Sequence, residues 1–193
     1  MSEESDETLL KRLAAGEERA ARFLLARYLP RVLALAQRML GSRSEAEDVA
    51  QEVFLRIWKQ AARWQPGGAR FSTWVHRVTS NLCIDRLRVR KSAPLEDAAL
   101  IADPAPGAES RVAEAEQSAR VAAALQSLPE RQRLALILVH YQELGNRETA
   151  EIMDCTVEAV EALLTRARKG LKDLLLKDAA FDAPVKAASG ERQ

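Results

Sequence analysis

The chain has 193 residues, with 29 lysines and arginines against 28 aspartates and glutamates, so its net charge is +1. A chain of this length fits either one domain or two small ones of ~100 residues. Its first residues are acidic, and nowhere do about 18 apolar residues follow one another, which excludes a secretory signal peptide and a membrane-spanning helix. We therefore expect a cytoplasmic protein that does not insert into a membrane.

The composition predicts an all-α protein. Alanine, leucine, arginine and glutamate are abundant, and no segment alternates apolar with polar residues over the length of a strand. The two cysteines, Cys83 and Cys155, lie far apart, and neither has a second thiol or a histidine at ligand spacing. We therefore expect no disulfide framework, no metal site and no other cofactor.

Four helices are predicted in the first part of the chain. They are expected at about Glu7–Ala15, Glu18–Leu40, Ser44–Arg63 and Ser72–Lys91. The expected N-caps are Ser5 or Asp6 for the first helix, Ser44 with Glu47 as a capping box for the third, and Ser72 for the fourth. Gly16 and Gly41 should end the first and second helices, and Gln65-Pro-Gly-Gly should break the chain after the third.

An acidic, proline-rich segment separates this part from the rest. Residues 61–92 carry seven basic groups against one acidic group, whereas residues 93–118 carry six acidic groups against one basic group. Pro94, Pro104, Pro106 and Gly107 lie between Ser92 and about Gly107, a stretch that has no sustained helical periodicity. We predict two small helical domains, residues 1–92 and 111–177, joined by a flexible acidic linker at 93–110 and followed by a disordered tail at 178–193.

The second domain contains the spacing of a helix-turn-helix. Helices are predicted at about Ala108–Gln126, Pro129–Tyr141, Asn146–Asp154 and Val157–Lys177. The last two fit a DNA-binding helix-turn-helix whose inner angle would be formed by Ala150, Ile152, Val157 and Val160. Thr156 can cap its second helix, and the cluster Arg166, Arg168, Lys169 and Lys172 suits phosphate contacts. A plain helical hairpin with a solvated charged end has the same pattern.

Two polar helix faces in the first domain are candidate binding surfaces. On the fourth helix, cations and an amide share one face, formed by Arg77, Asn81, Arg88 and Lys91, which suits single-stranded DNA. On the third helix, Asp48, Gln51, Glu52 and Arg56 follow a helical spacing and could receive a partner protein. From the sequence alone, ordinary solvated surface explains the face of the fourth helix equally well, and it is the favoured explanation for the face of the third helix. Trp58, Trp64, Phe71 and Trp74 are expected in the core.

Three motifs in this order resemble the extracytoplasmic-function sigma factors of bacterial RNA polymerase. Glu45-Ala-Glu-Asp-Val-Ala-Gln-Glu-Val-Phe is similar to the region that binds core polymerase, namely sigma region 2. Phe71-Ser-Thr-Trp-Val-His-Arg-Val-Thr-Ser-Asn-Leu-Cys-Ile-Asp-Arg-Leu-Arg is similar to the part of region 2 that opens DNA and reads the minus-ten element. Leu128-Pro-Glu-Arg-Gln-Arg resembles the start of region 4, the minus-thirty-five reader.

The resemblance implies a promoter-recognition factor that is not an enzyme and has no small-molecule substrate. The residues it would place against the clamp helices of the largest polymerase subunit are Asp48, Gln51, Glu52 and Arg56. The minus-ten DNA contacts would be Arg77, Asn81, Arg88 and Lys91, with Asn81 capturing a flipped base. The minus-thirty-five contacts would be Thr156, Glu158, Glu161, Arg166, Arg168 and Lys169. The family also implies control by an anti-sigma factor.

Three other functions are compatible with parts of the sequence. A helix-turn-helix regulator of the response-regulator or quorum type would need strand-helix alternation in the first half, which is absent from the pattern. A helical protein-interaction adaptor would show no salt-dependent DNA affinity. A helical enzyme would need clustered catalytic groups, whereas His76 and His140 are isolated.

Overall fold

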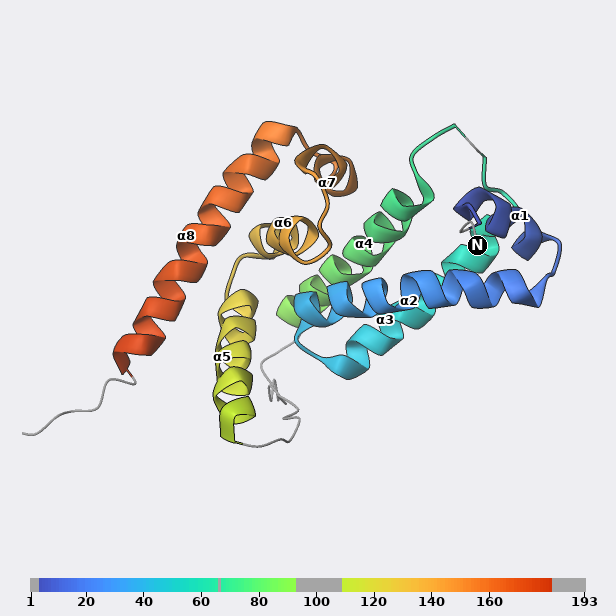
Figure 1. Cartoon of the computed structure of the whole chain (residues 1–193). Coiled ribbons are helices and arrows are strands. Elements are labelled where there is room, and N and C mark those ends of the chain that lie inside the picture. The colour runs from blue at the N-terminus through green and yellow to red at the C-terminus, as the bar shows by residue number, and fades with distance from the viewer. Residues whose placement is uncertain (1–3, 66, 93–108, 182–193) are drawn as a thin grey trace, which may run out of the picture.

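The computed structural model describes residues 4–65, 67–92 and 109–181, and within these ranges it consists of helices and their connections. The helices are α1 (Asp6–Ala14), α2 (Glu18–Leu40), α3 (Arg43–Ala61), α4 (Phe71–Ser92), α5 (Glu109–Gln126), α6 (Glu130–His140), α7 (Asn146–Met153) and α8 (Val157–Phe181). Figure 1 shows α1–α4 grouped together and α5–α8 beside them. We call these groups the N-terminal and the C-terminal module. The predicted all-α fold is confirmed.

The N-terminal module is built around α2, which packs against α1, α3 and α4. Its largest fully buried side chains include Tyr28, Leu35, Met39 and Ile57. Each such apolar side chain contributes roughly 1.5–3 kcal/mol when it leaves water. Gly41 ends α2 with φ +70°, the left-handed conformation that glycine adopts without steric cost. The predicted end of this helix is therefore confirmed.

The capping box predicted at Ser44 is wrong. The N-cap of α3 is Ser42, whose backbone is extended and whose hydroxyl accepts a hydrogen bond from the Glu45 amide over 3.4 Å. Ser44 therefore lies inside the first turn, where its hydroxyl is 3.1 Å from that of Ser42. The cap predicted at Ser72 is also wrong, because α4 already begins at Phe71.

An aromatic cluster closes one end of this module. Phe71 stacks on Trp74 and meets Trp64 and Tyr28 edge to face, with ring centroids 5.1–5.7 Å apart. These geometries are the ones that aromatic quadrupoles favour. The expected core role of Phe71, Trp64 and Trp74 fits this cluster, although the two tryptophans are only partly buried. Trp58 is 44% exposed on α3 and lies outside the core.

The C-terminal module has a small core of its own where α6, α7 and α8 meet. Ala135, Ala150, Val160 and Leu164 form it, and Val157 packs against it. The helix-turn-helix passes from α7 to α8 through Asp154, whose φ of +49° gives the left-handed turn. The second helix continues to Phe181, past its predicted end at Lys177.

The two modules pack against each other, with α4 beside α7 and α2 beside α5 and α6. Figure 1 shows α6 and α7 lying between α4 and α8. Ile152, predicted in the inner angle of the helix-turn-helix, instead belongs to the large buried cluster that runs through both modules, and it lines a cavity against α4. The predicted linker at 93–110 lies outside the described residues, apart from its last two. Among the described helices, none is long and apolar enough to cross a bilayer.

Candidate DNA and protein interfaces

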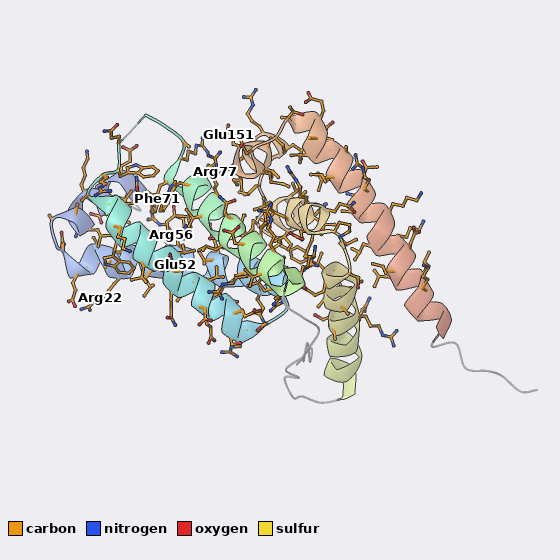
Figure 2. The ribbon with its side chains drawn as sticks, turned by 180° about the vertical axis from the view of Figure 1, so that it is seen from behind. Arg22, Glu52, Arg56, Phe71, Arg77 and Glu151 are labelled. Atoms are coloured by element: carbon orange, nitrogen blue, oxygen red, sulfur yellow. The ribbon has the colours of Figure 1, made fainter. Side chains whose placement is uncertain are left out.

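The polar face predicted on α3 is exposed to solvent. Asp48 lies 3.5 Å from the Arg86 guanidinium, and its side chain remains 62% exposed. Arg56 donates to Glu52 over 2.9 Å, one turn away on the same helix. Figure 2 shows Glu52 and Arg56 on the outer side of the N-terminal module. With Gln51, which is also exposed, these side chains form one continuous surface, which we call the α3 face.

Two apolar side chains on the α3 face were missed in the sequence analysis. Leu55 is 55% exposed and Trp58 is 44% exposed, although both are large apolar groups. Trp58 packs edge to face on Phe54, with ring centroids 5.8 Å apart, and this contact helps to fix the position of the exposed indole. A leucine at position 55 falls within the predicted polar stripe, and this break in the pattern was the available signal. Exposed aromatic and aliphatic groups rimmed by charge are typical of protein interfaces.

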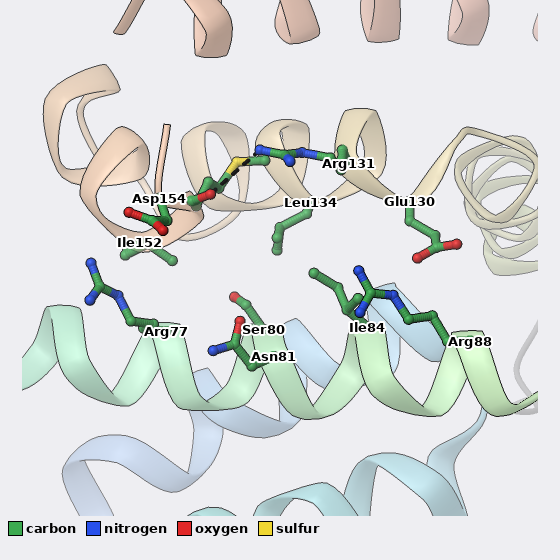
Figure 3. A pocket seen from close by; sticks show the side chains of 11 residues that line it. Arg77, Ser80, Asn81, Ile84, Arg88, Glu130, Arg131, Leu134, Ile152 and Asp154 are labelled. Atoms are coloured by element: carbon green, nitrogen blue, oxygen red, sulfur yellow. Dashed lines mark hydrogen bonds between the residues drawn. The ribbon is translucent and has the colours of Figure 1, made fainter. Parts of the chain in front are cut away.

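The predicted minus-ten residues share one face of α4. All four residues are exposed: Arg77, Asn81, Arg88 and Lys91. We call this surface the α4 face. Figure 3 shows Arg77, Asn81 and Arg88 projecting from α4 toward the helices of the C-terminal module. The structure therefore brings the predicted residues together, but directs them at the chain's own second module.

A cavity of about 310 Å³ lies between the α4 face and the C-terminal module. Asn81 and Ser80 line it from α4, and Leu134 and Ile152 line it from the opposite side (Figure 3). The Ser80 hydroxyl is buried and has no hydrogen-bond partner among the described residues. A buried hydroxyl without a partner costs free energy in this arrangement.

The start of α8 carries its own negative charge. Thr156 caps the helix by accepting a hydrogen bond from the Ala159 amide over 3.2 Å. Hydrogen bonds from the Glu158 backbone amide and the Thr156 hydroxyl lower the pKa of the Glu158 carboxyl. The backbone amides at this helix end are therefore partly engaged by the Thr156 hydroxyl and the Glu158 carboxylate. That Glu158 and Glu161 contact DNA bases remains a prediction.

Basic side chains follow further along α8. Arg166, Arg168 and Lys169 are exposed, as the sequence predicted. Arg168 also donates toward His140 Nε2 of α6 over 3.2 Å, which fixes one cation of the cluster against the module. Phosphate contacts from such groups position a protein on DNA without reading its sequence.

A buried arginine joins the two modules, and sequence analysis did not single it out. Arg133 of α6 is 6% exposed and donates to Met39 O of α2 over 2.5 Å, to Gln126 Oε1 over 2.6 Å and to Leu128 O over 3.1 Å. Burial lowers the pKa of its guanidinium from the ordinary value. An arginine next to the apolar run Leu134–Leu138 was the signal in the sequence.

Comparison with known proteins identifies both modules. Residues 24–93 match the sigma-70 region 2 family, and residues 118–171 match the sigma-70 region 4 family. The fold and the matched regions therefore define a two-region factor of the sigma-70 class.

Several curated relatives narrow the class. SigW of Bacillus subtilis is 30% identical over 86% of this chain and 94% of its own length, and SigM of Mycobacterium tuberculosis is 33% identical over 90% and 86%. SigE of Mycolicibacterium smegmatis is 33% identical over 80% of this chain, which spans 61% of that relative. All three are ECF RNA polymerase sigma factors. This chain belongs to the extracytoplasmic-function (ECF) sigma factors, which are transcription initiation factors.

Solved structures agree with this assignment. CnrH, in complex with the cytosolic domain of CnrY, superposes with a TM-score of 0.67 and 28% identity, over 91% of this chain and 99% of CnrH. RpoE of Bartonella quintana, in complex with the anti-sigma factor NepR, shares the fold with a TM-score of 0.62 and 21% identity, over 80% of this chain and 96% of that one.

Proposed function

We propose that this sigma factor binds core RNA polymerase through the α3 face. Asp48, Gln51, Glu52 and Arg56 would meet the clamp helices of the largest subunit, and Leu55 with Trp58 would form the apolar centre of that contact. The support is the exposure of two large apolar groups inside a charged rim. Interfaces commonly derive most of their binding energy from such central aromatic and aliphatic side chains.

Promoter recognition would be divided between the two modules. Arg77, Asn81, Arg88 and Lys91 of the α4 face would bind the minus-ten strand, with Asn81 holding an everted base. Thr156, Glu158, Glu161, Arg166, Arg168 and Lys169 of α8 would contact the minus-thirty-five element. Unstacking a base costs a few kcal/mol, so the contacts made to the everted base must offset that cost. Such a factor acts by binding, not by catalysis, in the cytoplasm where polymerase and DNA lie.

The observation that carries this proposal is the position of the two matched regions. Region 2 spans the α3 and α4 faces, and region 4 spans the helix-turn-helix. The side chains of both faces and of the basic cluster of α8 are partly or fully exposed, although the α4 face points toward the C-terminal module (Figure 3). We propose residues 1–92 as the region 2 domain and residues 111–177 as the region 4 domain.

Run-off transcription with purified core polymerase on a genomic promoter library tests the proposed function. We expect a limited set of promoters to be transcribed only when the chain is added. Start sites no more selective than those of core polymerase alone would contradict the proposal.

Control by an anti-sigma protein is the second part of the proposal. CnrH, the similar structure, is described in complex with a domain of another protein. A partner that covers the α3 face would block polymerase binding. Competition between that partner and core polymerase for the chain would test this, and simultaneous binding of both would reject it.

A further inference from the structure

The cavity beside α4 contains a buried polar atom that has no partner among the described residues. Ser80 is 1% exposed, and its hydroxyl makes no hydrogen bond there. Figure 3 shows this hydroxyl directed into the cavity, toward the facing helices α6 and α7. A buried hydroxyl without a partner is costly, and folded proteins retain few of them. A ligand in the cavity would supply the missing partner.

The apolar walls of the cavity suit one flat ring. Ile84 of α4 lines one side, and Leu134 of α6 lines the other together with Ile152 and Met153 of α7 (Figure 3). Aliphatic side chains and a methionine thioether pack favourably against an aromatic ring. The cavity volume of about 310 Å³ lies at the lower end of the range for small-molecule sites, which suits a single nucleoside.

Asn81 gives the cavity a group that can read the edge of a base. Its side-chain amide holds a donor and an acceptor in one plane, and it is exposed where it lines the cavity next to Ser80. Such an amide pairs in bidentate fashion with adenine, whose edge presents an amino donor beside a ring-nitrogen acceptor. The polar side of the cavity therefore favours adenine.

Charged groups around the cavity suit a phosphate and a ribose. Arg131 is exposed and donates to Met153 O over a long 3.5 Å, a single bond from a guanidinium that has five donors. A phosphate is a strong acceptor for such a group. The carboxylates of Glu130 and Asp154 also line the cavity. Glu130 is paired with Lys91, whereas Asp154 can accept hydrogen bonds from ribose hydroxyls.

We propose that this cavity binds one adenine mononucleotide, with the base held by Asn81 and Ser80 and the phosphate held by Arg131. Both matched regions build the site, because Ser80 and Asn81 belong to region 2 and Arg131 belongs to region 4. The site does not depend on the proposed function, but one consequence does. Asn81 is also the residue proposed to hold the everted minus-ten base, so the nucleotide and the promoter strand would compete for it.

Isothermal titration calorimetry of the full chain with AMP, without polymerase, tests the site. We expect one AMP to bind per chain, about tenfold more weakly to Asn81→Ala and about fivefold more weakly to Ser80→Ala, as for the loss of one or two hydrogen bonds. Gln37→Ala removes an exposed amide of α2 outside the cavity and should bind AMP as the wild type does. No binding of AMP, or equal binding by all four proteins, would overturn the proposal.

Thermal unfolding separates a ligand-binding hydroxyl from a structural one. Without ligand, Ser80→Ala should be at least as stable as the wild type, because alanine removes the unpartnered hydroxyl. With AMP present, the Tm of the wild type should rise more than that of the variant, since a ligand stabilises in proportion to its affinity. Equal rises in Tm would overturn the role of Ser80.

The chemistry of the ligand is tested with two relatives of AMP. Adenosine lacks the phosphate and cytidine monophosphate lacks the purine, so both should bind more weakly than AMP. Arg131→Ala should bind AMP no more tightly than it binds adenosine. Equal affinity of the wild type for the three compounds would overturn the assignment of an adenine nucleotide.

Promoter opening by the holoenzyme, measured without nucleoside triphosphates, tests the competition separately. Added AMP should slow opening by the wild type more than opening by Ser80→Ala. Opening that AMP does not slow would overturn the competition. A holoenzyme that opens no promoter even without AMP would reject the sigma activity, whereas the calorimetric result would stand, so the two proposals fail separately.

Discussion

The guanidinium of Arg133 in α6 donates to the backbone oxygen of Met39 in the last turn of α2, over 2.5 Å. The carbonyls at a helix C-terminus lack partners within the helix and carry its negative dipole. A cation from region 4 therefore satisfies the end of a region 2 helix. No carboxylate accepts a hydrogen bond from Arg133 among the described residues, so its charge is stabilised mainly by oriented backbone oxygens.

Replacing this arginine should destabilise the chain. We expect Arg133→Ala to lower the free energy of unfolding by about 2–4 kcal/mol, because several buried carbonyls lose their donor. Urea denaturation followed by circular dichroism measures it. Arg131→Ala is the control, since Arg131 is exposed on the same helix and should change stability by less than about 0.5 kcal/mol. Equal effects of the two variants would argue against the role of Arg133.

Asn81 should matter for promoter opening rather than for polymerase binding. We expect Asn81→Ala to slow open-complex formation by about tenfold or more, because one base contact contributes roughly 1–3 kcal/mol. Permanganate footprinting measures opening, and a fluorescence titration measures affinity for core polymerase, which should not change. Val89→Ala, an exposed change on the same helix, should affect neither. Equal losses of opening and of polymerase affinity would reject the base-reading role.

The exposed tryptophan of the α3 face should contribute strongly to polymerase binding. We expect Trp58→Ala to weaken affinity for core polymerase by about tenfold to thirtyfold, as for a central interface residue worth about 2 kcal/mol. Replacing Asp48 and Gln51 together should also lower this affinity. The matched control is Arg22→Ala on α2, whose ion pair with Glu18 is fully on the surface. Unchanged affinity in the Trp58 variant would refute the assignment of the α3 face.

Salt dependence should identify the phosphate contacts of α8. We expect Lys169→Ala to reduce the slope of log affinity against log salt by about 1, with a similar loss on every promoter. Titrations of the polymerase holoenzyme on duplex promoter DNA at several salt concentrations measure the slope. Asp173→Ala, on the same helix, should not reduce it. A loss confined to one sequence would indicate base reading instead.

The stability of the chain should depend on pH through His76. This imidazole is buried, and burial lowers its pKa from the ordinary value, although hydrogen bonds with Gln142 and Ser72 and the charge of Glu148 act in the opposite direction. The unfolded chain therefore binds the proton more readily than the folded chain. Stability should be complete above the ordinary pKa of ~6.5 and should fall as the pH drops below it.

Urea denaturation between about pH 5 and pH 7.5 measures this dependence, across the ordinary histidine pKa. His76→Gln should flatten the curve in this range. His140→Gln, which replaces the other histidine of the sequence, an exposed one, is measured as a control for the substitution itself. A slope that survives in the His76 variant would assign it to other groups.

The sequence predicted the helices well because their apolar periodicity and glycine stops are local signals. Two N-caps were placed wrongly, at Ser44 and Ser72. Neighbouring residues can each start a helix, and the one that does so depends on how the helix packs against the rest of the fold. The residues of the α4 face were found from helical spacing alone. That this face meets α6 and α7 could not be found, because contacts such as Arg77 with Glu151 join segments far apart in the chain. Ile152 was misplaced for the same reason.

Gly41 does more than stop α2. A methyl group at this position would lie 3.0 Å from the Gln126 side chain, and the φ of +70° already disfavours any other residue. A substitution here would thus push α2 of region 2 and α5 apart where they meet. Every residue predicted to contact polymerase or DNA would remain unaltered. A side chain at this single backbone position would therefore weaken the packing between regions 2 and 4.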